Sequence, residues 1–145
     1  MNAPTESDRT IKWLLALYTA YACVFIYNTS FVIGGIRHFS LFDDAMVSMR
    51  YAKNFAGGFG LVWNPGGEWV EGYTNPLWVL FMSGLHLLPV ARSTVSLLVQ
   101  ESAALLLLVN LIFVARIADL VSGRSKVVSI CAVLLTAFYL PLNSW

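Results

Sequence analysis

The chain has 145 residues and a formal net charge of +1; hydrophobic residues make up 58% of it and charged residues only 12%. Soluble domains are about 45–50% apolar and about 25% charged, so the mean hydropathy of +0.70 excludes a disordered chain and argues against a soluble domain. The nearly neutral charge predicts no nucleic-acid partner. The composition therefore predicts an all-α integral membrane protein.

Residues 1–12 form a predicted cytoplasmic tail, and the following run, residues 13–36, contains no charged side chain. That run exceeds the ~20 residues that a spanning helix needs. A cleaved signal peptide is the alternative, because Ala20 and Ala22 match a small-residue cleavage site, but the apolar run continues well past them. We therefore expect a retained transmembrane helix over residues 13–36.

Three further apolar stretches follow in the sequence. Residues 76–90 are too few for an ordinary span, which favours a re-entrant or short transmembrane helix. Residues 94–115 and 127–145 are predicted transmembrane helices, joined by a basic loop at residues 116–126. Cys23 and Cys131 lie in apolar runs, so we expect two small buried residues rather than a disulfide.

Lysine and arginine counts favour a topology in which residues 76–90 only dip into the membrane. With a cytoplasmic amino terminus, that arrangement puts five of these cations inside and four outside, whereas a spanning segment puts three inside and six outside. Cytoplasmic loops carry the excess of positive charge. We expect three transmembrane helices plus a half-depth helix, with the loop from residue 37 to about residue 94 facing outward. Since the chain ends near the predicted end of its last helix, we expect the opening module of a longer protein or a very small subunit.

The outer loop, residues 37–75, carries ordered local signals. Ser40 and Asp43 fit a capping box that begins a helix, and the glycines at 57–58 should end it. This juxtamembrane amphipathic helix would lie on the membrane with Asp43, Arg50 and Asn54 on its polar, water-facing side. Its apolar stripe would consist of Phe42, Met46, Met49 and Ala56, with Ala45 and Ala52 nearby.

Two short apolar pieces within residues 61–70 flank the sequence Asn-Pro-Gly-Gly, which is a strong turn signal. We expect a small hairpin at the interface, with Trp63 and Trp69 as membrane-belt aromatics. Pro76 then suits the first turn of the next helix.

Asp43 and Asp44 are the main catalytic candidates. Two adjacent carboxylates at a bilayer surface repel each other and lose hydration, so they suit a general base or a divalent cation held through oxygen. In the alternative, Asp43 only caps its own helix and Asp44 is solvated. Arg50 and Lys53 either hold a lipid phosphate or are ordinary interfacial cations.

Glu101 interrupts an apolar helix, where an ionisable group is costly and indicates a functional site. In the alternative, it lies near the helix end and reaches the interface, or it pairs with a partner outside this chain. His38 and His86 have no partner at metal-ligand spacing, so no zinc site is expected.

Four motifs in residues 41–78 carry a family resemblance. They read FDDA at 42–45, RYAKN at 50–54, GFGLVWNPG at 58–66 and VEGYTNPLW at 70–78. This pattern resembles the first outer loop of bacterial GT-C class polytopic membrane glycosyltransferases. The nearest pattern is that of the arabinofuranosyltransferases, and the protein mannosyltransferases and lipid A aminoarabinose transferases are more distant.

The resemblance implies an inverting transfer of a sugar from a polyprenyl-phosphate donor to an acceptor hydroxyl at the outer face of the cytoplasmic membrane. The acceptor would be a cell-envelope glycan, lipid or protein, and the only cofactor in question is a divalent cation at Asp43 and Asp44. One of these two aspartates would be the base. Family members have many more helices, so this chain would supply only part of the donor cavity. The predicted substrate-binding residues are Arg50, Lys53, Asn54, Glu71, Tyr73, Asn75 and Glu101.

Two other functions remain open at this stage. The chain is alternatively a non-catalytic membrane subunit, or a truncated remnant, that binds lipid or a partner. A transport component with Glu101 lining a path is a third reading, but a pore has no need of so ordered an outer loop.

Overall fold

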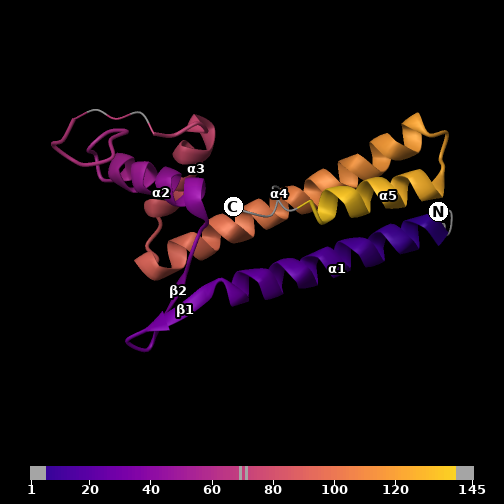
Figure 1. The fold of residues 1–145 in the computed structure, drawn as a ribbon, viewed down its shortest axis with the longest axis horizontal. Helices are drawn as coiled ribbons and strands as arrows, with labels where there is room; N and C mark the ends of the chain where they lie inside the picture. Colours follow the sequence, from indigo (N-terminus) through magenta and orange to yellow (C-terminus); the bar gives the residue numbers. More distant parts are fainter. Residues whose placement is uncertain (1–5, 69, 71, 140–145) are drawn as a thin grey trace. The chain divides into compact units, whose positions relative to one another are not determined.

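The computed structural model describes residues 6–68, 70 and 72–139. This part of the chain is mostly helical, with five helices and one two-stranded antiparallel sheet (Figure 1). The chain divides into two compact units, which are described separately: unit 1 within residues 1–25 and 102–144, and unit 2 within residues 26–101. The elements are α1 (Glu6–Asn28), β1 (Ser30–Ile33), β2 (Ile36–Phe39), α2 (Asp43–Ala56), α3 (Pro76–His86), α4 (Arg92–Val121) and α5 (Lys126–Ala137).

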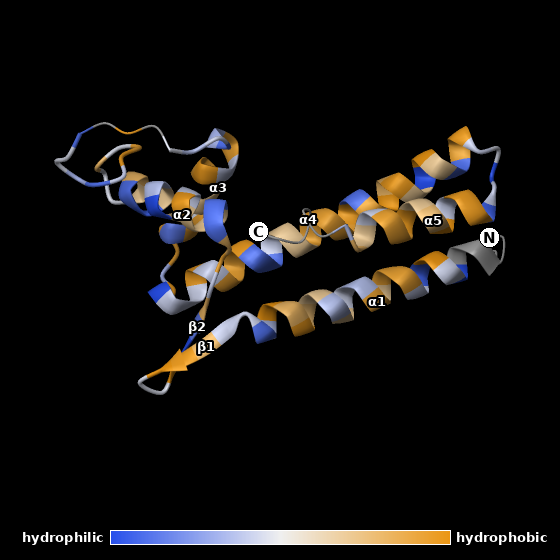
Figure 2. Cartoon of the chain, in the orientation of Figure 1, coloured by the Kyte–Doolittle hydropathy of each residue, from blue (hydrophilic) through white to orange (hydrophobic). Residues whose placement is uncertain are grey.

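Two helices are long and apolar enough to cross a membrane. They are the segment Arg9–Asn28 of α1, with 20 residues, and α4, with 30 residues, so each matches the ~20 residues that span a bilayer. Only 17% and 28% of their most apolar windows are buried. Figure 2 shows apolar residues distributed along both helices. Most of this apolar surface is therefore left without a protein core to cover it.

The other two predicted membrane segments form shorter helices. α3 has 11 residues and α5 has 12, or about 16 Å and 18 Å at 1.5 Å per residue, against a hydrocarbon core of about 30 Å. The helix predicted over residues 127–145 therefore ends at Ala137, and residues 140–145 lie outside the described part. Conversely, the helix predicted over residues 94–115 is longer at both ends and covers Arg92–Val121.

The first predicted helix, over residues 13–36, ends eight residues early. α1 stops at Asn28, and a hairpin of β1 and β2 follows, with Ile33 paired to Ile36. The two glycines between the strands have φ angles of 57° and 81°, which a two-residue type I′ turn requires. The absence of charge in residues 13–36 predicted one continuous helix. The Gly-Gly pair between two β-branched residues instead favours a hairpin, and the hairpin is what forms.

The predicted loop helix is confirmed as α2, although its start differs from the prediction. Phe42 occupies the N-cap without a side-chain bond, and Ser40 Oγ instead donates to the Leu41 carbonyl, so the capping box does not form. At the other end, Phe59 N–H donates to Asn54 O and Gly58 N–H donates to Phe55 O, both at 3.0 Å. These two bonds define a Schellman motif, with the glycine in the left-handed conformation.

The buried face of α2 also differs from the predicted apolar stripe. Phe42 and Met46 are 43% and 48% exposed. The buried positions are Ala45 and Ala52, which were expected near that stripe, together with Ser48 and Tyr51, which were not. This face packs against α3 in the core of unit 2, so the helix is an integrated part of a folded unit. The core of unit 2 comprises Leu41, Ala45, Tyr51, Ala52, Val79, Met82 and Val99.

The predicted hairpin over residues 61–70 is wrong, because its described residues form turns and bends rather than strands. The turn itself is present, since Gly67 N–H donates to Asn64 O at 3.1 Å. Trp69 lies outside the described residues. Pro76 stands in the first turn of α3, as predicted.

Within unit 1, polar contacts fasten α5 to the end of α4. Ser129 Oγ donates to Asp119 Oδ1, and Arg124 N–H donates to Asp119 O at 2.7 Å where α4 ends. Cys23 and Cys131 are free, as expected, but both are exposed rather than buried. The expectation failed because burial in a membrane-type helix is set by neighbouring helices, not by the apolar character of the sequence around it.

The Schellman motif of α2 makes a stability prediction that a matched glycine can control. Gly58 has φ +80°, and a methyl group there would meet nothing within 4 Å, so Gly58→Ala should cost about 1 kcal/mol through backbone conformation alone. Gly84, inside α3, also has open space around it. Gly84→Ala should therefore stabilise by up to about 1 kcal/mol. Thermal unfolding in detergent measures both, and equal shifts would contradict the assignment.

Candidate functional site

The acid pair lies at the beginning of α2. Asp43 and Asp44 form its first turn and both are exposed. The amino-terminal end of a helix favours negative charge, because its free N–H groups carry a partial positive charge. Asp43 has a φ angle of +21°, an uncommon value for a residue with a side chain. Two solvent-facing carboxylates are thus held on an ordered support at one end of unit 2.

A metal at this pair would need ligands from elsewhere. In the parts of the chain that the structure describes, no group of three or more histidine, cysteine or acidic side chains could hold a metal ion. Two adjacent carboxylates alone leave most positions of a six- to eight-coordinate cation to water or substrate. The acid pair could therefore hold a cation only with further ligands from water or substrate.

Arg50 ties the loop that follows α2 back onto that helix. Its Nε donates to Trp63 O at 3.0 Å, and its NH2 nitrogen donates to Asn64 Oδ1 at 2.6 Å. The guanidinium also lies 4.2 Å from the Trp63 ring centroid, a cation–π contact. These bonds use two of the five N–H donors of an exposed guanidinium, so the role of Arg50 at a lipid phosphate stays a prediction.

Asn54 and Lys53 are adjacent in sequence but do different things. The Asn54 amide donates to Val62 O at 2.8 Å and to Trp63 O at 2.9 Å, so it also ties the loop to α2. Lys53 is exposed and stands in the last turn of α2. Of the polar stripe predicted to face water, Asp43 and Arg50 are exposed, whereas Asn54 is partly covered by the returning loop.

The second loop motif is also built into unit 2. Asn75 Oδ1 accepts a hydrogen bond from Ser48 Oγ at 2.8 Å, and the Tyr73 ring packs edge-on against Tyr51 at 5.0 Å between centroids. Glu71 lies outside the described residues. Asn75 and Tyr73 therefore position the start of α3 against α2.

Glu101 is exposed on α4, so it is not a buried charge inside a bundle. Its neighbour Gln100 is the buried polar residue of that helix, with no exposed surface. The Gln100 amide donates to Ser40 O at 3.1 Å and to Thr29 Oγ1 at 3.2 Å. In unit 2, Gln100 thus fixes the two ends of the β-hairpin segment to α4.

Tyr51 is the central residue that the sequence reasoning missed. Its ring is 1% exposed, and its hydroxyl donates to Val70 O at 2.6 Å. It contacts Trp63 as well as Tyr73. The sequence feature that could have indicated its importance is its position in the RYAKN motif, between the candidates Arg50 and Lys53.

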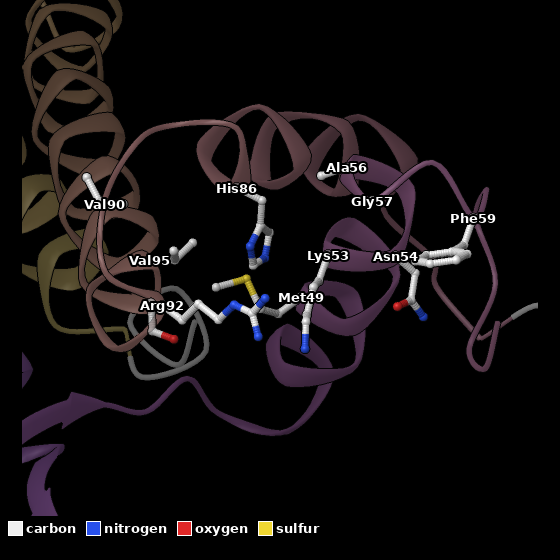
Figure 3. Close-up of a pocket in the computed structure, with 11 residues that line it drawn as sticks. Met49, Lys53, Asn54, Ala56, Gly57, Phe59, His86, Val90, Arg92 and Val95 are labelled. Atoms are coloured by element: carbon white, nitrogen blue, oxygen red, sulfur yellow. The ribbon is translucent and has the colours of Figure 1, made fainter.

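A cavity of about 520 Å³ opens at the other end of α2, between α2, α3 and the start of α4 (Figure 3). Its polar groups include Lys53, His86 and Arg92. Desolvation and the nearby Lys53 charge lower the pKa of His86; a hydrogen bond to the Met49 backbone opposes this shift, and Arg92 adds to it. The lining residues are Met49, Lys53, Asn54, Ala56, Gly57, Phe59, His86, Val90, Arg92, Val95 and Ser96.

No family model, curated protein or solved structure matches the chain. The fold defines a mostly helical protein with two helices long and apolar enough to cross a membrane.

Proposed function

We propose that the chain is the amino-terminal module of a membrane glycosyltransferase that uses a polyprenyl-phosphate sugar. The observation that carries the proposal is the packing of the motif residues into one unit. Tyr51 from the RYAKN motif contacts Trp63 from the third motif and Tyr73 from the fourth. The exposed acid pair of the first motif stands on the same helix. The motif residues therefore pack against one another, and the two carboxylates of the first motif stay exposed.

In the proposed reaction, one carboxylate of the acid pair is the general base. It removes the proton of the acceptor hydroxyl while that oxygen attacks the anomeric carbon. The bond between that carbon and the phosphate oxygen breaks, and polyprenyl phosphate leaves with the electron pair. A single displacement inverts the anomeric configuration. Asp43 and Asp44 are both accessible enough to meet an acceptor.

Membrane integration is part of the proposal. The segment Arg9–Asn28 and α4 would cross the bilayer of the cytoplasmic membrane, with the acid pair on the outer side. The uncovered apolar surface of both helices supports this arrangement. α3 is about 16 Å long, a length that suits the predicted half-depth segment.

The test is transfer by membranes that contain the full gene product. Synthetic farnesyl-phosphate pentoses and hexoses serve as donors, and released farnesyl phosphate is measured by mass spectrometry, because this product is common to all the sugars. Sugar transfer that is lost on replacement of Asp43 or Asp44 supports the proposed glycosyltransferase activity. Release that is unchanged in both asparagine variants contradicts it and favours the non-catalytic subunit that binds lipid or a partner.

A further inference from the structure

The cavity at the end of α2 concentrates positive charge without a compensating acid. Lys53 and Arg92 carry positive charge, Figure 3 shows His86 near both of them in the lining, and none of the described lining residues is acidic. Lys53 and Arg92 both act on His86 electrostatically, which places the three groups close together. A cavity of this kind favours an anion.

The three basic groups come from three different helices, all within unit 2. Lys53 is in the last turn of α2, and His86 is in the last turn of α3, where the helix dipole favours a cation. Arg92 begins α4, whose free N–H groups and positive dipole end favour an anion. Folding of unit 2 therefore assembles a site that no single segment contains.

His86 provides a binding atom that is still unused. Its Nε2 is buried and has no hydrogen-bond partner in the described structure. An unpaired buried polar atom is costly, and a ligand oxygen would remove that cost once the ring is protonated. Asn54 and Ser96 add polar groups to the lining.

We infer that this cavity binds a phosphate group through Lys53, His86 and Arg92. Phosphate fits because its several oxygens accept from cations on different sides at once. The cavity volume of about 520 Å³ leaves room for a larger headgroup. The lining also includes Val90, Val95 and Phe59, which can contact an apolar group attached to that phosphate.

This site is separate from the acid pair and goes beyond the proposed glycosyl transfer. Lys53 is ten positions after Asp43 along α2, or about 15 Å at 1.5 Å per residue. A phosphate bound at Lys53 is therefore too far to be the leaving group of a reaction at Asp43. It would instead anchor unit 2 to a phosphate-bearing molecule while the acid pair stays free.

Two arms of one experiment separate a lipid headgroup from a free phosphate. The full-length protein is placed in phosphatidylcholine nanodiscs, and its thermal stability is followed while inorganic phosphate is added. A second sample contains phosphatidic acid, and the lipid retained by the protein is counted by native mass spectrometry. A saturable rise in the unfolding temperature in the first arm supports a site that binds the phosphate group alone. Retention only in the second arm supports a site that also needs the lipid's apolar part.

The variants decide whether the cavity is responsible. Lys53→Gln and Arg92→Gln should each weaken binding about tenfold, and the double variant more, because each loses a charged hydrogen bond. Arg124→Gln removes the same net charge at an exposed position in unit 1 and should bind like the wild type. Binding by Lys53→Gln and Arg92→Gln at the wild-type level would overturn the proposal. Because the single variants are measured separately, a failure of the double variant to fold does not affect the result.

His86 adds a pH dependence of predictable sign. Sulfate is the probe, because it remains a dianion throughout the range. Burial, Lys53 and Arg92 lower the pKa of His86 below 6.5 in the free protein, against the hydrogen bond to the Met49 backbone; a bound anion raises it again. Sulfate should therefore bind more tightly as the pH falls from 7.5 to 5.5, and His86→Gln should remove this increase. A wild type without such a trend would contradict the role of His86.

Discussion

Replacing the catalytic member of the acid pair with asparagine is expected to lower the rate of sugar transfer by about 10²- to 10⁴-fold, the usual contribution of a positioned general base. Asparagine keeps the shape of the side chain and removes its basicity. It also tolerates the φ angle of +21° at Asp43 better than most residues. Release of farnesyl phosphate by membranes carrying Asp43→Asn or Asp44→Asn measures the effect.

Stability serves as the internal control for this experiment. Both aspartates are exposed, so their loss should change the free energy of unfolding by less than about 1 kcal/mol. Glu68→Gln removes another exposed carboxylate of unit 2 and should leave transfer unchanged. If Glu68→Gln lowers transfer as much as Asp43→Asn and Asp44→Asn, the effect is general charge loss and the assignment of the base fails.

The two single variants also separate the roles within the pair. If one aspartate is the base and the other only lowers the charge of the helix end, one variant loses transfer and the other changes it a few fold. If the pair acts as a unit, each single variant costs nearly as much as the double variant. Either result identifies a catalytic carboxylate. Wild-type rates in both single variants and in the double variant would contradict a catalytic role for the acid pair.

Local signals in the sequence were enough to predict much of unit 2. α2, its end at two glycines, the Asn-Pro-Gly-Gly turn and the proline at the start of α3 all follow from backbone preferences of the residues themselves. The low charge of residues 13–36 predicts one continuous helix, whereas the structure has a β-hairpin after α1. The placement of Gly34 and Gly35, and not the low charge, decides the structure here.

The roles of the polar residues could not be predicted in the same way. The hydrogen bonds of Arg50 to residues 63 and 64 could not be predicted, because the return of this loop onto α2 is a long-range contact. The cavity joins Lys53, His86 and Arg92, which are up to 39 positions apart in sequence. No local sequence pattern could therefore predict it. Which polar groups meet depends on long-range packing, and only the fold shows it.

Tyr51→Ala is expected to have the largest effect on stability, about 3–5 kcal/mol, because it empties the centre of the unit 2 core. Tyr51→Phe keeps the ring and loses only the hydrogen bond to Val70 O at 2.6 Å, which is worth about 1 kcal/mol. Amide hydrogen exchange of α2 and the loop after it, compared with exchange of α5, measures both. Equal protection in Tyr51→Ala and the wild type would show that Tyr51 does not hold the unit together.

Gly72 provides a second, independent test of the same packing. A methyl group at position 72 would lie 2.9 Å from Tyr51 Oη, whereas the nearest ring carbon would be 3.5 Å away. Gly72→Ala should therefore destabilise unit 2 strongly in the wild-type background and only weakly when combined with Tyr51→Phe, since the hydroxyl that causes the clash is then absent. The double-mutant cycle should be non-additive, with a coupling energy on the order of 1–3 kcal/mol. Additive effects would mean that the tyrosine hydroxyl does not contact the loop that carries the fourth motif, and the packing argument for a single functional unit would fail with it.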